Sequence, residues 1–557
     1  MTPAAQAALP VAAALGWALC LVAVTWSLRA AWAEPVAGSP GWKWWTLAAA
    51  VLLCFRWPLL GVPHQFNPDE SQLIAGAITL RHDPVFWRAV DGTTAGPLDF
   101  YPLLPAAWVE GMASYAVARL IGLAMIFGAV VFAGEALAIL AGAALARMAV
   151  LPAVAAIAFT TYPDFVHYSS ELMPVLLLAA AGWLVVRSGA APSTGRLWLI
   201  ALVLGAVGWA KLQAAPIAAG LWLIVAARNC WAGRSRALFP LAAGALLPTL
   251  AWLGLAALTG QMENLIVPYL LNNLAYVGAP VLSWTNVASE LWQNALLDGF
   301  LGLWLAGAAV FLVLTGLRYA HAASAGQRAA VVTALVILAM AIFSALAPRR
   351  ASGHYLLLLP LPLLWLSGTL LALGWPREGT PAAARGRLRL AGIFLVCALV
   401  PQLAWRVIGA DPFAFINAQG PNPARRELTT LVRTYAARNE PLAVWGWRSS
   451  LYVEAGRRQA TRQAHSVAQI NPGPLQSYFL RRYLEDFQAA NPPVFADAVG
   501  PGNFAFRNRD RAHEAFPPLA AWVRTRYTQV ADLDGTRLFV RNDRLAATAA
   551  APVPARP

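Results

Sequence analysis

Apolar residues recur in blocks from the N-terminus to about residue 407, near the length of about 20 that a helix needs to cross a bilayer. We place twelve spans at about 9–28, 44–62, 114–143, 148–162, 173–187, 196–210, 213–228, 237–258, 295–317, 329–346, 354–374 and 388–407. No spanning block follows Ala410. The pattern predicts an α-helical polytopic membrane domain over 1–407 and a separate soluble domain over 408–557.

Short alternating stretches within 408–557 predict strands at 442–447, 493–496 and 536–540. Helical spacing occurs between them at about 478–489 and 519–527. This alternation is typical of a small α/β domain. It contains no glycine fingerprint for nucleotides.

Composition agrees with a membrane protein, since 59% of the 557 residues are hydrophobic and 12% are charged. Soluble domains carry about 25% charged residues, so a water-soluble fold is excluded. The net charge of +15 does not indicate a nucleic-acid partner, because many basic residues lie in short loops between spans. Four cysteines in apolar segments or a basic loop imply no disulfide framework.

The basic residues also predict sidedness, because cytoplasmic loops are enriched in Lys and Arg. Alternate connections carry Arg29 with Lys43, Arg147, Arg187 with Arg196, Arg228 with Arg234 and Arg236, Arg318 with Arg328, and Arg377 with Arg385, Arg387 and Arg389. The connections at 63–113, 163–172, near Lys211, 259–294 and 347–353 then face outward, with the C-terminal domain. We expect a multi-pass protein of the bacterial inner membrane whose N-terminus and C-terminal domain are extracytoplasmic.

The first outer loop contains an acidic motif, Asn67-Pro68-Asp69-Glu70. Apolar spacing from Asp69 to Leu80 predicts a helix lying along the membrane surface. Asp69 at its start has two interpretations, a helix cap or a functional carboxylate. The stretch from Gly96 to Leu103, which includes Asp99 and Tyr101, predicts a bent re-entry into the membrane.

Arg349 and Arg350 break the charge rule by lying in an outer turn. They either snorkel to lipid phosphates or bind a phosphate-bearing ligand, since Arg presents a fork of donors to phosphate oxygens. Lys211 admits the same two interpretations. The outer segment with Asp164, His167 and Glu171 is either a polar rim or a metal site, although its ligands lack a recognised spacing.

In the order of these motifs the chain resembles the GT-C membrane glycosyltransferases, specifically bacterial relatives of protein mannosyltransferases and lipid A aminoarabinose transferases (glycosyltransferase family 39-like). The matching stretches are Asp69-Glu70, Gly96-Pro97-Leu98-Asp99-Phe100-Tyr101, Tyr168-Ser169-Ser170-Glu171 and His354-Tyr355-Leu356-Leu357-Leu358-Leu359-Pro360. The last departs from the family by having His where Arg is usual. An extra N-terminal span also departs from the simplest family topology.

The resemblance implies transfer of a sugar, with inversion, from a polyprenyl-phosphate carrier to an acceptor hydroxyl at the outer membrane face. It implies Asp69 as general base, with Glu70 assisting it or holding a cation. Donor phosphate would be bound by Arg349, Arg350, His354, Tyr355 and Lys211, and acceptor or metal by Glu171, Asp164, His167, Asp99 and Tyr101. No cofactor is required, although a divalent cation is left open.

Three other functions fit parts of the pattern. A transporter or flippase of lipid-linked sugars also has about twelve spans, but we see neither repeat halves nor a buried charge array. An O-antigen ligase or polymerase usually lacks a large C-terminal domain. A non-catalytic assembly partner is a third alternative. The acceptor, whether glycolipid, polysaccharide or protein, and the sugar are not encoded in any motif.

Overall fold

The computed structural model describes residues 3–33, 38–109, 111–279, 281–319, 321, 323–409 and 422–550. The chain divides into two compact units. The helical unit comprises Met1–Val62, Arg119–Trp252 and Tyr276–Phe415, and the mixed unit comprises Pro63–Ala118, Leu253–Ala275 and Ile416–Pro557. The predicted domain boundary near residue 408 stays a prediction, since residues 410–421 lie outside the described residues.

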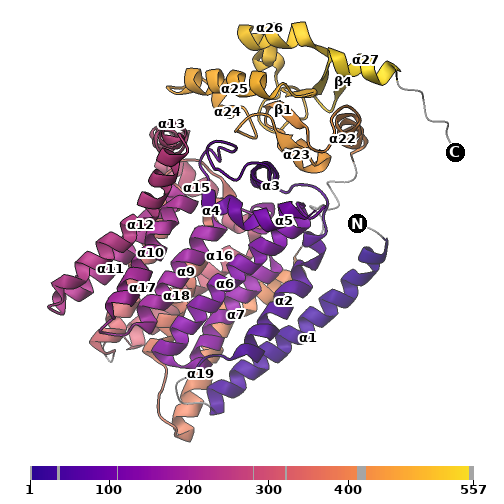
Figure 1. Ribbon diagram of the computed structural model, residues 1–557. Coiled ribbons are helices and arrows are strands. Elements are labelled where there is room, and N and C mark those ends of the chain that lie inside the picture. The colour runs from indigo at the N-terminus through magenta and orange to yellow at the C-terminus, as the bar shows by residue number, and fades with distance from the viewer. Residues whose placement is uncertain are drawn as a thin grey trace. The chain divides into compact units, whose positions relative to one another are not determined.

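The helical unit is a bundle (Figure 1). Its elements are α1 (Pro3–Ala33), α2 (Trp42–Leu60), α6 (Tyr115–Ala141), α7 (Ala143–Phe159), α8 (Pro163–Val166), α9 (Leu172–Arg187), α10 (Thr194–Ala210), η2 (Leu212–Ala214), α11 (Ala215–Trp231), η3 (Ser235–Ala237), α12 (Leu238–Leu258), α14 (Asn272–Gly278), α15 (Trp284–Asp298), α16 (Phe300–Tyr319), α17 (Ala325–Leu346), η5 (Gly353–Leu358), α18 (Pro360–Leu373), α19 (Pro381–Ala398) and α20 (Val400–Ile408). Every residue of α7 is buried, and α7 packs against α1, α2, α16 and α18. The core of the unit therefore surrounds α7.

A helix lies at each of the twelve predicted spans. Among the described residues, seven helices are long and apolar enough to cross a membrane, or eight if one bent pair is a single span, while α7, α9 and α10 are shorter apolar helices. The chain is thus helical and multi-pass, and the number twelve stays a prediction.

The bent pair replaces the predicted span over 295–317. Helices α15 and α16 meet at 104°, so residues 295–298 belong to α15 and continue in another direction. Gly299 between them has a φ of 76°, which favours glycine. The carboxylate of Asp298 accepts the Leu301 N–H at 2.8 Å and so caps α16.

The mixed unit contains a five-stranded sheet in the order β2-β1-β3-β5-β4. Its elements are α3 (Pro68–Leu80), α4 (Pro97–Phe100), η1 (Tyr101–Leu103), α5 (Leu104–Trp108), α13 (Met262–Leu265), η4 (Ile266–Leu271), α22 (Pro423–Tyr435), β1 (Pro441–Gly446), α23 (Ser450–Ala455), β2 (Arg458–Gln459), α24 (Val467–Ile470), α25 (Gln476–Ala490), β3 (Val494–Ala498), η6 (Arg509–Arg511), η7 (His513–Ala515), α26 (Pro517–Arg526), β4 (Tyr527–Leu533), β5 (Thr536–Arg541) and α27 (Asn542–Ala550). Strand β1 runs parallel to β2 and β3, and β5 is antiparallel to β3 and β4. The predicted strands and helices of this domain are confirmed, and β2, β4, α22 and α23 are additional.

Alternating residues of β1 face two separate cores, as the two-residue period of a strand requires. Leu442 and Val444 pack with α22 and α23, whereas Ala443 and Trp445 pack with α25 and α26. Both faces of the sheet are therefore covered by helices.

Helix α3 of the first outer loop also belongs to this unit. Ala75 lies in the core shared with α22 and α23, and the Thr79 hydroxyl accepts the Gln459 N–H at 3.0 Å. The helix is where the spacing predicts it. Its apolar residues, however, are covered by protein, because α3 packs against α23 and β2. Helix α3 is therefore a buried element of the mixed unit, and its position along the membrane surface stays a prediction.

Candidate active site

The acidic motif of the mixed unit is organised by Asn67. The Asn67 side chain accepts the Asp69 N–H at 2.9 Å, and Pro68 occupies the first turn of α3. Glu70 is fully buried, and its carboxylate accepts the Phe66 N–H at 3.2 Å. Asn67 makes the cap, so the interpretation of Asp69 as the capping residue is wrong. Glu70 thus fixes the backbone that precedes α3.

A histidine from the C-terminal domain lies in the electrostatic field of Asp69. His465 is 6% exposed, in the loop after β2. Burial lowers the pKa of His465 to about 4, against the opposing charges of Asp69 and Asp91. The imidazole is therefore neutral at pH 7. Sequence reasoning missed His465, since no local motif marks it and only the fold of the mixed unit brings it near α3.

Asp99 and Tyr101 follow in the predicted re-entry, now α4 and η1. Phe100 between them is buried against α3, where a Cβ at Gly76 would lie 2.4 Å from its ring. The Tyr101 hydroxyl donates to the Pro84 carbonyl at 2.8 Å. Tyr101 thus fixes the loop, and the acceptor or metal role of both residues stays a prediction.

In the helical unit Lys211 meets the segment before α9. Lys211 is 4% exposed, donates to the Ser170 hydroxyl at 2.7 Å and forms an ion pair with Glu171, which is fully buried. Burial alone would raise the pKa of Glu171, but the charge of Lys211, helped by His354 and by hydrogen bonds, lowers it to about 2. Lys211 is therefore held inside the protein, and the snorkelling interpretation is wrong for it.

His354 and Tyr355 of η5 join the same cluster. The His354 Nδ1 lies 3.9 Å from a carboxylate oxygen of Asp164, and its ring lies 5.8 Å from that of His167. The Lys211 ammonium lies 5.2 Å from the centre of the Tyr355 ring. Three predicted segments, distant in sequence, thus converge within the helical unit.

Arg349 and Arg350 precede η5 and are half-buried. Their guanidinium groups lie over aromatic rings, Arg349 at 5.4 Å from the centre of Trp284 and Arg350 at 4.2 Å from that of Tyr276. Arg349 has a φ of 49°, an uncommon backbone conformation for a residue with a side chain. Neither forms an ion pair with a carboxylate among the residues that the structure describes. Their positive charges therefore have no carboxylate partner within the described part of the chain.

Asn294 of α15 holds this turn in place. Its side-chain oxygen accepts from the Tyr162 hydroxyl at 3.1 Å, and its side-chain nitrogen donates to the Ala351 carbonyl at 3.1 Å. The Tyr355 hydroxyl in turn shares a 2.8 Å hydrogen bond with Tyr276, which also lies under Arg350. Sequence reasoning missed Asn294, because its partners lie far away along the chain.

The predicted metal ligands do not form a metal-binding group in the described part of the chain. One group of three His and acidic side chains there has ligand atoms within 4.8 Å of one another, namely Asp497, His513 and Glu514. Arg537 already donates to Asp497 at 2.6 Å and to Glu514 at 2.7 Å. A cation thus already balances these carboxylates, and a divalent ion for the enzyme stays a prediction.

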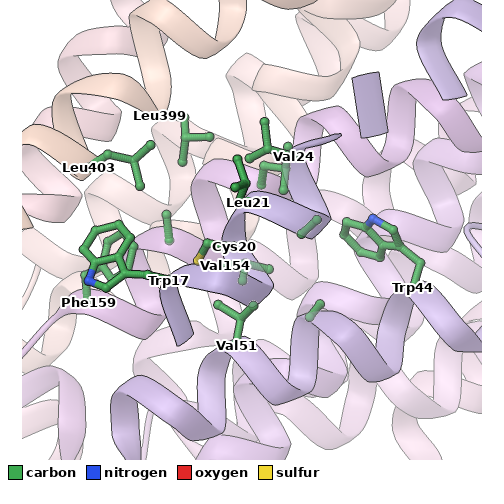
Figure 2. Close-up of a pocket in the computed structure, with 14 residues that line it drawn as sticks. Trp17, Cys20, Leu21, Val24, Trp44, Val51, Val154, Phe159, Leu399 and Leu403 are labelled. Atoms are coloured by element: carbon green, nitrogen blue, oxygen red, sulfur yellow. The ribbon is translucent and has the colours of Figure 1, made fainter. Parts of the chain in front are cut away.

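A cavity of about 220 Å³ lies elsewhere in the helical unit, among α1, α2, α7 and α20 (Figure 2). Trp17, Leu21, Val51 and Leu403 are among its almost wholly apolar lining residues. None of the predicted site residues lines it. The cluster around Lys211, Glu171 and His354 and this cavity are therefore separate features.

Comparison with known proteins gives no match to a family model and no match among curated proteins. Solved structures do show similarity. ArnT from Cupriavidus metallidurans in the apo state is 12% identical, with a TM-score of 0.44 over 92% of this chain and 99% of that one. The oligosaccharyltransferase of Archaeoglobus fulgidus, in complex with Zn and sulfate, is 12% identical with a TM-score of 0.44 over 82% of this chain and 68% of that one. The same protein tethered to an acceptor peptide is also 12% identical with a TM-score of 0.44, over 90% of this chain and 74% of that one.

Both proteins are GT-C glycosyltransferases. That is the class which the motifs of this chain resemble. At 12% identity and a TM-score of 0.44, the similarity does not establish the activity of this chain.

Proposed function

We propose that this chain is an inverting glycosyltransferase of the bacterial inner membrane, which moves a sugar from a polyprenyl-phosphate carrier to an acceptor hydroxyl outside the cytoplasm. The observation that carries the proposal is the pair of guanidinium groups at Arg349 and Arg350, which have no carboxylate partner in the described part of the chain. A buried or half-buried cation ordinarily has an anionic partner. Here the protein supplies aromatic rings and, for Arg350, a hydrogen bond of 3.5 Å to the Ala279 carbonyl, while the fork of guanidinium donors is suited to phosphate oxygens.

In the reaction the bond between the anomeric carbon and the phosphate oxygen breaks, and a bond from the acceptor oxygen to that carbon forms. Negative charge grows on the leaving phosphate, where donors held in advance stabilise the transition state most. Arg349 and Arg350 supply those donors. Asn294 and Tyr276 keep their turn in place, so little reorganisation is needed during the reaction.

The acceptor hydroxyl must lose its proton as it attacks, and Asp69 takes that proton as general base. The side chain of Asn67, and not that of Asp69, accepts the capping N–H of α3. Glu70, which accepts the Phe66 N–H, acts as a positioning residue for the loop.

The test measures release of polyprenyl phosphate from a radiolabelled lipid-linked sugar by the purified chain in lipid nanodiscs. Asp69→Asn should reduce release by at least about 1,000-fold, at the upper part of what general base catalysis supplies. The matched control is Asp83→Asn in the same loop, whose carboxylate pairs on the surface with Arg88 at 2.7 Å. It should keep release within about twofold, since exposed ion pairs contribute little.

Retained release by Asp69→Asn would remove Asp69 from the reaction. A wild-type protein that moves the labelled lipid across a vesicle membrane without releasing the phosphate would instead be a flippase. Melting temperatures of both variants should match the wild type, because neither carboxylate caps the helix.

A further inference from the structure

Three aromatic side chains of the mixed unit form a cluster at one edge of its sheet. Trp447 directly follows β1, His465 lies in the loop after β2, and Phe504 lies in the loop after β3. The Trp447 ring is 4.7 Å from the His465 ring and 5.2 Å from the Phe504 ring, between centres. We call these three residues the aromatic cluster.

The topology of the sheet gives this edge a special position. The chain passes from β1 to β2 on one side and then to β3 on the other side, and the three strands are parallel. In open parallel sheets ligands bind beyond the carboxyl ends of the strands, where the strand order reverses. All three members of the aromatic cluster follow the carboxyl ends of these strands. Gly446 permits the sharp exit from β1, with a φ of 101°.

The chemistry of the cluster fits a neutral ligand. Phe504 is 56% exposed, so its ring is accessible to a ligand. The indole N–H of Trp447 is buried without an acceptor in the described part of the chain. His465 is held neutral by burial. The neighbouring cation, Arg448, is already engaged by Asp534 at 2.9 Å and by the Thr536 hydroxyl at 2.8 Å.

Aromatic rings with a few polar donors, beside a cation that is already paired, match a sugar ring, which presents an apolar C–H face and hydroxyl oxygens. A phosphorylated or carboxylated ligand would leave its charge unpaired here, at a large cost. The charge of Asp69 acts on His465, so the cluster lies within electrostatic range of the candidate base.

We propose that the aromatic cluster of Trp447, His465 and Phe504 binds a neutral sugar ring of the acceptor, so that the acceptor of this enzyme is a glycan or glycolipid. The identification of this sugar as part of the acceptor rests on the proposed function. The binding of a neutral sugar itself does not depend on turnover.

The first experiment measures binding by saturation-transfer NMR on the full chain in lipid nanodiscs. Maltoside detergents are avoided, because their head groups would compete. The probes are the methyl glycosides of glucose, galactose, mannose and N-acetylglucosamine, with a Ser/Thr peptide as the alternative ligand. Saturation transfer to at least one glycoside is expected with the wild type.

Phe504→Ala should weaken the binding of that glycoside at least fivefold, and Trp447→Ala should abolish it. Phe504 is exposed, so its variant should keep the wild-type melting temperature even if Trp447→Ala fails to fold. The control is Trp108→Ala, which removes an aromatic ring of similar exposure, 59%, from the same unit. It should bind the glycoside as the wild type does. Equal binding by Phe504→Ala, transfer to the peptide alone, or no transfer to any glycoside would overturn the proposal.

The second experiment separates this proposal from the proposed function. If the wild type releases polyprenyl phosphate, Phe504→Ala should raise the KM for a glycan acceptor at least fivefold while kcat stays within twofold. Release with an unchanged KM would overturn the sugar site and leave the transferase standing. Glycoside binding without any release of polyprenyl phosphate would overturn the proposed transferase and leave the sugar site standing.

Discussion

Two groups of cations in the helical unit stand out in the sequence for the same reason, since both break the charge rule for outer connections. Lys211 is almost completely buried and is balanced by Glu171. Arg349 and Arg350 are half-buried and lie over Trp284 and Tyr276 without a carboxylate partner in the described chain. The presence of a cation does not itself make an anion site. What decides is whether the protein has already balanced the charge.

The difference follows from the two side chains. An ammonium is compact and strongly hydrated, so burying it requires an anion and hydrogen-bond acceptors. A guanidinium is planar and weakly hydrated, so it can lie on an aromatic face and keep its N–H groups for another partner. Lys211 is thus balanced within the protein while its donor-binding role stays a prediction, and the two arginines are candidate ligand-binding residues.

The largest effect is expected when the balanced pair is broken. Lys211→Met should cost about 3–5 kcal/mol of stability, because it leaves Glu171 buried without its cation. The double variant Lys211→Met with Glu171→Gln should recover most of that loss. Lys43→Met, which removes the exposed lysine of α2, is the control and should change stability by less than about 0.5 kcal/mol. The apparent melting temperature in nanodiscs measures all three, and an unchanged value for Lys211→Met would contradict the pair's structural role.

The next effect concerns His465, whose burial disfavours the charged form of the imidazole. Its pKa of about 4 lies below the unfolded value near 6.5, so between these values the unfolded chain binds a proton that the folded chain does not. Stability should therefore fall as pH decreases from about 6.5 to about 4, by up to about 3 kcal/mol, and this contribution should be fully present above pH 6.5. The measurement is the melting temperature against pH, for the wild type and for His465→Gln.

The glutamine variant should lose this part of the pH dependence while keeping whatever other groups contribute. Asp69 and Asp91 favour the charged imidazole, so Asp91→Asn should lower the pKa of His465 further and extend the loss of stability to lower pH. Identical pH profiles for the wild type and His465→Gln would show that the pKa of His465 is the same in the folded and the unfolded chain.

The sequence allowed the local features to be predicted. Apolar blocks located the helices, two-residue alternation located β1, β3 and β5, and apolar spacing from Asp69 to Leu80 located α3. These features depend on neighbours within a few residues. Charge placement also identified Lys211 and the two arginines as exceptions.

Long-range pairing could not be predicted. Nothing near Ala75 indicates that α3 completes the core of a domain that begins more than 300 residues later. The roles of Asn294 and His465 likewise arise from partners in other segments. Amphipathic spacing identifies an apolar face, but it does not distinguish a lipid surface from a protein core. That ambiguity accounts for the expectation that α3 lies on the membrane.

The two arginines without a carboxylate partner in the described chain give the third prediction. Arg350→Lys keeps the positive charge but loses the fork of donors and the planar contact with Tyr276. We expect kcat/KM for polyprenyl-phosphate release to fall about 10- to 100-fold, which is about 1.4–2.7 kcal/mol of transition-state stabilisation. The melting temperature should stay nearly constant, since no protein anion loses its partner. Arg377→Lys, in a connection predicted to be cytoplasmic, is the control and should leave kcat/KM unchanged.

A smaller effect separates helix capping by Asn67 from the proposed catalysis by Asp69 in the acidic motif. Asn67→Ala should cost about 1 kcal/mol of stability, because the Asp69 N–H loses the acceptor that caps α3. Asn67→Asp restores an acceptor and should recover that stability. Since the side chain of Asn67 makes the cap, Asp69→Ala should leave the free energy of unfolding within about 0.5 kcal/mol of the wild type while release of polyprenyl phosphate is lost. If Asp69→Ala instead melts like Asn67→Ala, the carboxylate stabilises the helix, and its assignment as general base loses the structural distinction on which it depends.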